Sequence, residues 1–168
     1  MLDPKEQFSQ IYDQYIDKIY RFVYLKVNSQ ETAEDITSKV FLRGWESFQK
    51  NRDSIENPSA FLYQIARNAV IDFYREKGRT NMVSTEYVVE IKDPGANLQE
   101  KAILSSDVEL VKSAMQNLKK DYQDVIIWHY LDGLNVAEIA GILEKPEGTV
   151  RVMLHRGLKE LKKIIQEV

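Results

Sequence analysis

The sequence has no cysteine and only two histidines, His129 and His155, among its 168 residues. Disulfide bonds, thiolate metal ligands and cysteine nucleophiles are therefore excluded, and a metal site built on clustered histidines is not expected. It also lacks an apolar run of the roughly 20 residues that a membrane span requires. The opening residues carry acidic side chains where a secretory signal peptide would have an apolar stretch. We therefore expect a cytoplasmic protein without a metal or a cofactor.

The sequence also lacks the residue combinations from which common active sites are built. It has no glycine-rich loop that could hold a phosphate group. The neighbouring acids Glu34 and Asp35 point in different directions on a helix, so they do not form a catalytic pair. We therefore predict that the protein is not an enzyme and has no small-molecule substrate.

Charge is distributed unevenly along a chain of ordinary globular composition. The hydrophobic fraction is 43%, the charged fraction is 29% and the formal net charge is −3. Two segments are nevertheless basic: residues 58–80 hold four basic and two acidic side chains, and residues 148–168 hold five and two. Residues 81–111, by contrast, hold two basic and six acidic side chains. The net charge hides this asymmetry, which makes the two basic segments the informative feature.

Apolar residues in the first half recur with a period of 3.6, which predicts three amphipathic helices. In the first helix the apolar residues recur over residues 8–23, and the helix is expected to end at Asn28. Thr32 is expected to cap the second helix with its hydroxyl. Asn57 is expected to cap the third, because a proline follows it at the first helical position. A polar loop is expected over residues 47–57.

The second half is helical again and contains a recognisable supersecondary pattern. Apolar periodicity predicts helices over residues 108–118 and 122–131, and Asn135 with Glu138 predicts a capping box that opens a short helix. A turn at 144–148 then leads into a last helix with a basic face. This order is typical of a helix-turn-helix DNA-binding unit. The alternative interpretation is an ordinary amphipathic terminal helix with a solvated basic face.

A segment of different composition separates the two helical halves. Residues 81–105 have few large apolar side chains and contain Asp93-Pro94-Gly95, while residues 87–91 could form a short strand. A linker of that length is unusual inside one compact domain. We therefore predict an all-α protein in which two small helical domains, residues 1–80 and 106–168, are joined by a flexible acidic linker at 81–105.

Motifs in both halves resemble those of bacterial sigma factors. Region 4 of that family is similar to the segment from Leu131 to Leu143 together with Pro146-Glu-Gly-Thr-Val-Arg151 and His155-Arg-Gly-Leu158. Regions 2.2 to 2.4 are similar to Ala33-Glu-Asp-Ile36, Val40-Phe41, Trp45 and the segment from Phe61 to Asn68 with Asp72 and Arg75. The motifs occur in the family's order, without a recognisable region 1.1 or region 3. This organisation resembles the extracytoplasmic function (ECF), or group IV, sigma factors.

The resemblance implies a function and a set of site residues. Such a protein binds core RNA polymerase and directs promoter-specific transcription initiation by recognising the −35 and −10 elements and helping to melt the DNA. Contacts to the −35 element are expected from Thr149, Arg151, Val152, His155, Arg156 and Lys159. Contacts to the −10 element are expected from the loop at 47–57 and from Phe61, Tyr63, Arg67, Asn68, Arg75, Lys77 and Arg79.

The same resemblance implies the protein partners. Core RNA polymerase is expected to bind through its flap and through the clamp helices of its largest subunit. The clamp-helix contact is expected from Asp35, Lys39, Leu42 and Arg43. An anti-sigma factor is the expected regulatory partner, and promoter DNA is the expected nucleic acid.

Other functions could use these residues. A helix-turn-helix regulator that does not act as a sigma factor would use its N-terminal half for dimerisation or sensing, and polymerase pull-down would reveal it. An adaptor would bind an acidic protein with its basic face and would show no salt-dependent binding to promoter DNA. At the level of residues, Phe61 could belong to the core. Asp35 and Lys39 could form an ordinary i, i+4 charge pair on a solvated face.

Overall fold

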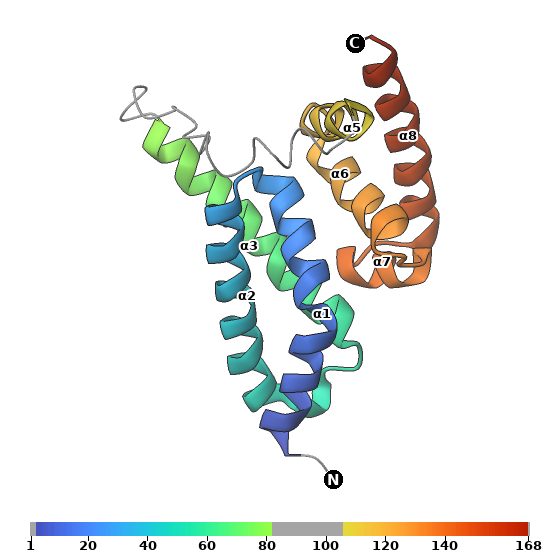
Figure 1. Cartoon of the computed structure of the whole chain (residues 1–168). Helices are drawn as coiled ribbons and strands as arrows, with labels where there is room; N and C mark the ends of the chain where they lie inside the picture. The colour runs from blue at the N-terminus through green and yellow to red at the C-terminus, as the bar shows by residue number, and fades with distance from the viewer. Residues whose placement is uncertain (1–2, 82–105, 168) are drawn as a thin grey trace.

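The computed structural model describes residues 3–81 and 106–167, and every regular element within these ranges is helical (Figure 1). The predicted all-α fold is therefore confirmed. The strand predicted at 87–91 and the part of the predicted linker beyond Asn81 lie outside the described residues. No helix in the described ranges combines the length and the apolar character that crossing a membrane requires.

The N-terminal unit consists of α1 (Pro4–Val27), α2 (Gln30–Asn51) and α3 (Pro58–Asn81). The break between α1 and α2 falls at Asn28, as predicted, and this residue has a left-handed backbone with φ of 55°. The Ser29 hydroxyl accepts a hydrogen bond from the Thr32 backbone N–H at 3.3 Å, so Ser29 rather than Thr32 caps α2. The Asn57 side chain accepts from the Ala60 backbone N–H at 3.2 Å, as expected of a cap.

The polar segment after α2 is more helical than its composition predicts. α2 continues to Asn51, and the short 3₁₀ turn η1 (Arg52–Ser54) follows, so the predicted loop at 47–57 is wrong in its first half. The physical reason is Phe48, which is only 5% exposed and packs against Phe8 with ring centroids 5.5 Å apart. One buried aromatic residue thus extends the helix through polar neighbours.

The C-terminal unit consists of α5 (Ser106–Gln116), α6 (Lys120–Ile126), the π-helical turn η3 (Ile127–Leu131), α7 (Val136–Leu143) and α8 (Glu147–Gln166). The predicted capping box is present, because Asn135 accepts from the Glu138 N–H at 2.8 Å and donates its own N–H to Glu138 at 3.2 Å. Gly133 has φ of +73°, a conformation that a residue without a Cβ adopts at no steric cost.

A glycine sets the distance between α6 and α8. A Cβ built on Gly157 would lie 3.0 Å from Ile126 Cδ1 and 3.2 Å from Tyr122 Cβ, which is tighter than ordinary packing. The absence of a side chain at this position therefore lets the last helix lie close to α6. This contact holds the back of α8 and leaves its opposite face free.

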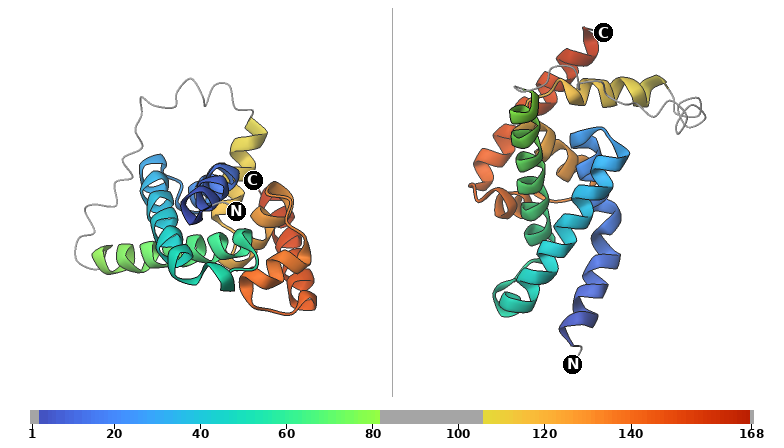
Figure 2. Two further views of the ribbon diagram at one scale, coloured as in Figure 1. Left: turned by 90° about the horizontal axis from the view of Figure 1, so that it is seen from below. Right: turned by 90° about the vertical axis from the view of Figure 1, so that its left-hand side faces the viewer.

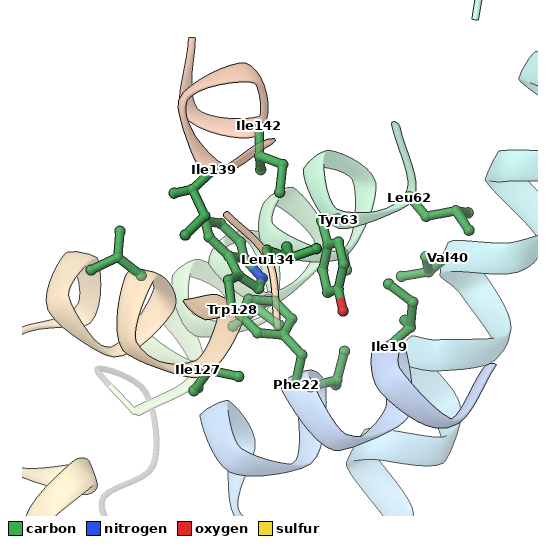
Figure 3. Packing of buried hydrophobic residues seen from close by; sticks show 14 of the residues in the cluster. Ile19, Phe22, Val40, Leu62, Tyr63, Ile127, Trp128, Leu134, Ile139 and Ile142 are labelled. Carbon is green, nitrogen blue, oxygen red and sulfur yellow. The ribbon is translucent and has the colours of Figure 1, made fainter. Parts of the chain in front are cut away.

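The two units pack against each other along one side of the N-terminal bundle. α1 and α3 face the C-terminal unit, while α2 lies on the remote side of the bundle (Figures 1 and 2). At the contact, Trp128 from η3 is fully buried between Phe22 and Tyr63, at centroid distances of 5.4 and 5.8 Å (Figure 3). The buried apolar residues form one cluster that continues across both units. Independent folding of residues 1–80 and 106–168 stays a prediction.

Candidate nucleic-acid interface

The last helix separates an anchoring side from an exposed side. Val150, Met153 and Leu154 are buried and fix α8 to the rest of the C-terminal unit. The six residues predicted to contact the −35 element are all exposed: Thr149, Arg151, Val152, His155, Arg156 and Lys159. The helix-turn-helix formed by α7 and α8 therefore presents an exposed surface over three helical turns that holds Arg151, Arg156 and Lys159.

Two details of this surface go beyond the sequence pattern. Val152 is 45% exposed although it is apolar, so it stands among the basic residues as a candidate contact for a thymine methyl group. Arg151 lies 3.7 Å from the Glu147 carboxylate one turn earlier, and both side chains are more than half exposed. An exposed pair of this kind contributes little to stability, so Arg151 remains available to a phosphate or a base.

The residues predicted to contact the −10 element divide between two faces of α3. Asn68, Arg75 and Lys77 are exposed, and Phe61 is partly buried against the core. Phe61, Asn68 and Arg75 are seven residues apart, which places them along one stripe of the helix. The Arg79 side chain is outside the described part of the structure. Tyr63 and Arg67 lie on a different face, which the C-terminal unit covers.

Tyr63 is completely buried, which the sequence did not predict. Its hydroxyl donates a hydrogen bond to Asp132 Oδ2 at 2.6 Å, and its ring contacts Phe22 and Trp128 edge-on. Arg21 from α1 pairs with the other oxygen of the same carboxylate. Burial raises the pKa of the Tyr63 hydroxyl, and the hydrogen bond to Asp132 raises that pKa further. In this arrangement Tyr63 contacts the C-terminal unit and is not accessible to DNA.

Arg67 is also held by acids of the C-terminal unit. Its Nε lies 3.2 Å from Asp124 Oδ2, and its Nη2 lies 3.6 Å from Asp121 Oδ1. The other oxygen of Asp124 lies 2.8 Å from Lys26 Nζ, and both of these side chains are about 95% buried. Burial lowers the pKa of the Lys26 amine and raises the pKa of the Asp124 carboxyl, and the attraction between the opposite charges opposes both shifts.

The residues predicted to bind polymerase lie on the outer side of α2. Asp35, Lys39, Leu42 and Arg43 are all exposed, and Leu42 is 60% exposed. A leucine that projects this far from a polar helix face is a candidate for burial against a partner. The Arg43 guanidinium lies 4.0 Å from Asp72 on α3, at an exposed site where such a pair is weak.

Sequence reasoning missed the residues that join the two units. Lys26, Asp124 and Asp132 are charged residues near helix ends, and such residues are usually solvated. Lys26 and Asp124 are 98 positions apart, so no periodicity in the sequence links them. The most relevant sequence signal is Asp132 followed by Gly133. This pair predicts a helix end, but it does not predict the hydrogen bond between Asp132 and Tyr63.

The fold and the two basic helices define a class of DNA-binding protein: a helix-turn-helix unit combined with a helical bundle. Comparison with known proteins identifies the family. The family model "Sigma-70 region 2" matches residues 11–80, and "Sigma-70, region 4" matches residues 109–161. The chain therefore belongs to the sigma-70 family of bacterial RNA polymerase sigma factors, within its ECF group.

Individual relatives agree with this assignment. The chain is 32% identical to the ECF RNA polymerase sigma factor SigW of Bacillus subtilis, over 98% of this chain and 91% of that protein. It is 28% identical to the ECF RNA polymerase sigma factor BldN of Streptomyces coelicolor, over 96% of this chain, and it spans 61% of that relative's length.

Solved structures share the fold. The sigma factor RpoE of Bartonella quintana, in complex with the anti-sigma factor NepR, matches with a TM-score of 0.75 and 22% identity over 96% of this chain and 98% of that one. CnrH, in complex with the cytosolic domain of CnrY, matches with a TM-score of 0.69 and 15% identity over 97% of this chain and 90% of that one.

Proposed function

We propose that this sigma factor reads the −35 element with the exposed side of α8 and the −10 element with the stripe of α3 that contains Asn68. The observation that carries this proposal is the exposure of all six predicted residues on α8 above a buried apolar anchor. The protein carries out no covalent reaction and acts in the cytoplasm, where the polymerase is.

On α8 the side chains have different chemical capacities. Arg151 and Arg156 can each present a two-donor fork to a guanine edge, a contact worth roughly 1–3 kcal/mol of discrimination. Val152 lies between them and can contact a thymine methyl group. Lys159 carries a point charge suited to a phosphate, so it contributes affinity without sequence preference.

On α3 the exposed stripe suits an unpaired strand. Asn68 offers donors and an acceptor to a base edge, and the partly exposed Phe61 ring offers a stacking surface. Arg75 and Lys77 can hold the phosphates on either side. Capturing extruded bases offsets the few kcal/mol that unstacking each step costs, and this capture favours promoter melting.

Polymerase attachment is assigned to the exposed face of α2, where Leu42 provides apolar area and Lys39 and Arg43 provide charge. This face lies on the side of the bundle away from the C-terminal unit (Figure 1), so it is open even while the two units are in contact. We infer an anti-sigma factor as the regulatory partner, because RpoE and CnrH share this fold and RpoE was solved with the anti-sigma factor NepR.

In vitro transcription with core RNA polymerase and a genomic promoter library tests the function directly. The expected result is initiation at a small set of promoters that share a −35 and a −10 element. Binding to DNA without binding to polymerase would instead support a helix-turn-helix regulator. Binding to neither would support the adaptor function.

A further inference from the structure

A cavity of about 320 Å³ lies between α1, α3 and α6 and is lined by side chains of both units. Pockets that bind small molecules are typically about 300–1,000 Å³, so this one has room for a small ligand. We propose that it binds a small organic anion, a molecule with a compact ring body and one carboxylate, sulfonate or phosphate group. This molecule is a ligand and not a substrate. The inference goes beyond the proposed function, because no step of promoter recognition requires the cavity.

The inner part of the cavity has apolar walls. Phe22 from α1 is fully buried, and Val70 from α3 is 2% exposed. Ile71 and Tyr74, also on α3, are half-buried and line the same space. The Tyr74 hydroxyl donates a hydrogen bond to the Lys26 backbone carbonyl, which fixes the orientation of the aromatic ring. A ligand ring placed against these side chains leaves water, and this transfer favours binding.

The cavity is lined by four cationic and two anionic side chains, so its walls carry an excess of two positive charges: Lys26, Arg67, Arg75 and Lys120, with Asp121 and Asp124. Asp124 lies 2.8 Å from Lys26 Nζ and 3.2 Å from Arg67 Nε. Asp121 lies 3.6 Å from Arg67 Nη2. Both carboxylates are therefore already paired with cations of the N-terminal unit. This pairing favours an anionic ligand over a cationic one.

Arg75 and Lys120 supply the uncompensated charge at the protein surface. Both side chains are exposed, and they come from different helices, α3 and α6. Within residues 3–81 and 106–167, neither forms an ion pair with a carboxylate. Lys120 Nζ instead lies 3.8 Å from the centre of the Tyr74 ring, which holds the ammonium group beside the apolar wall. A guanidinium and an ammonium group placed here can bind the acid group of a ligand whose ring lies further in.

The apolar walls distinguish a free small molecule from a DNA strand as the source of the anionic group. Arg75 is also assigned to the phosphates of the −10 strand, so a DNA phosphate could reach the exposed cations. A phosphate within a strand has a sugar on each side, however, and these sugars keep the strand outside the buried part of the cavity. Only a free molecule can place a ring against Phe22 and Val70.

The first experiment tests the charge requirement with anilinonaphthalene sulfonate (ANS), an aromatic sulfonate that binds apolar sites and fluoresces there. The full chain should bind one ANS molecule in a saturable titration. Arg75→Gln with Lys120→Gln should weaken ANS binding roughly tenfold or more, because two charge-assisted contacts are lost. The matched control is Lys77→Gln with Lys119→Gln. It removes the same charge from exposed neighbouring positions that do not line the cavity, and ANS affinity should be unchanged.

The second experiment tests the location of the probe. Ile71→Trp fills the apolar part of the cavity and should abolish ANS binding, while binding of a short fluorescent single-stranded DNA should be unchanged. Leu161→Trp on α8 introduces the same ring at a half-buried position outside the cavity walls and should change neither affinity. Circular dichroism verifies that each variant is folded. If Ile71→Trp fails to fold, the exposed charge pair of the first experiment still decides the outcome.

The results either support the cavity ligand or overturn it. Loss of ANS binding in the charge variant and in Ile71→Trp, with both controls unchanged, supports it. Absence of saturable ANS binding to the wild type overturns it, and so does equal ANS affinity in the charge variant and its control. Equal loss of ANS and DNA binding in Ile71→Trp would assign the cavity to DNA and also overturn it. Transcription with core polymerase is assayed separately, and its failure would count against the proposed function alone.

Discussion

Adjacent side chains on α3 have opposite environments. Arg67 is bound by two acids of the C-terminal unit, and Asn68 faces solvent. Tyr63, one turn before Arg67, is buried, whereas Phe61 remains partly exposed. Substitutions at these four positions therefore report on different events. Substitutions of Asn68 and Phe61 test the proposed contact with DNA, while substitutions of Tyr63 and Arg67 test first the contact between the units.

Arg156 should determine −35 specificity more than Lys163. Both are exposed on α8, two turns apart, but only Arg156 lies within the predicted recognition surface and can offer a two-donor fork to guanine. Arg156→Ala should reduce discrimination between −35 variants by roughly 1–3 kcal/mol, and Lys163→Ala should weaken all variants about equally. Competition binding of the reconstituted holoenzyme to a panel of −35 variants measures both effects. Equal loss of discrimination from the two substitutions would contradict the assignment.

Asn68 should act in promoter opening and not in polymerase attachment. Its exposed amide lies on the stripe assigned to the −10 strand, whereas attachment is assigned to α2. Asn68→Ala should leave core-polymerase affinity unchanged and reduce open-complex formation on duplex promoters, as measured by permanganate footprinting beside a core-binding titration. Gln10→Ala removes an exposed amide from α1 and serves as the control.

A promoter template with a pre-melted bubble distinguishes two roles of Asn68, extrusion of a base and recognition of that base. Partial rescue on the bubble means that the amide mainly helps extrusion of the base. Continued impairment, with tolerance of −10 changes that the wild type rejects, means that it reads the base. Normal melting of duplex promoters by the variant would show Asn68 to be only a structural residue of α3.

At the scale of single elements, α8 has two sides with different requirements. One side carries the exposed cations, and the other approaches α6 so closely that a Cβ at position 157 would lie 3.2 Å from Tyr122 Cβ. The tight packing keeps the exposed side in a fixed orientation relative to α7. Stability of the unit and the proposed contact with DNA thus depend on the same helix.

Gly157→Ala should destabilise the protein by about 1–3 kcal/mol, the usual cost of overpacking. The added methyl group would meet Tyr122 Cβ, which lies next to the backbone and has little room to move. Gly148→Ala is the matched control in the same helix, since nothing lies within 4 Å of its added Cβ. Urea unfolding followed by circular dichroism measures both free energies. Equal stability of the two variants would mean that α6 and α8 separate easily.

At the scale of the whole molecule, an apolar cluster and two buried acids hold the units together. The cluster gives the contact its area, and the two acids pair with Arg21, Lys26 and Arg67 of the N-terminal unit. The exposed surfaces of α2 and α8 remain accessible in this arrangement. Both proposed binding surfaces are therefore open while the two units are in contact.

The folded protein should lose stability in alkaline solution because of Tyr63. Its hydroxyl has a raised pKa in the folded protein, whereas in the unfolded chain it ionises near pH 10. Above that pH the unfolded state releases the proton first, so the stabilisation present at lower pH is lost as pH rises, by up to about 1.4 kcal/mol per pH unit. Tyr63→Phe should show a shallower decline in unfolding free energy between pH 9.5 and 11. Identical slopes for the two proteins would show that Tyr63 ionises equally easily in both states.

The sequence by itself determined the local structure and the family. The 3.6-residue periodicity, the capping pair of Asn135 and Glu138 and the glycine at position 133 depend on neighbours within a few residues, so their outcome could be predicted. The exposure of the six α8 residues could also be predicted. When apolar residues bury one side of a helix, the residues on the opposite side face the solvent. The ordered motifs of regions 2 and 4 identified a sigma factor, and the comparisons confirmed it.

Only the tertiary structure decided which predicted −10 residues are accessible. Tyr63 and Asn68 were both candidates in the sequence, as polar side chains on the same helix, and the resemblance favoured Asn68 because it matches the family position that contacts the −10 element. Burial depends on what packs against each face, and here the partners Asp132 and Trp128 come from more than 60 positions away. No local pattern encodes such a pairing, because the charge of Asp132 is compatible with solvent as well as with Tyr63. The division of α3 into a covered and a free face is therefore a property of the packed molecule.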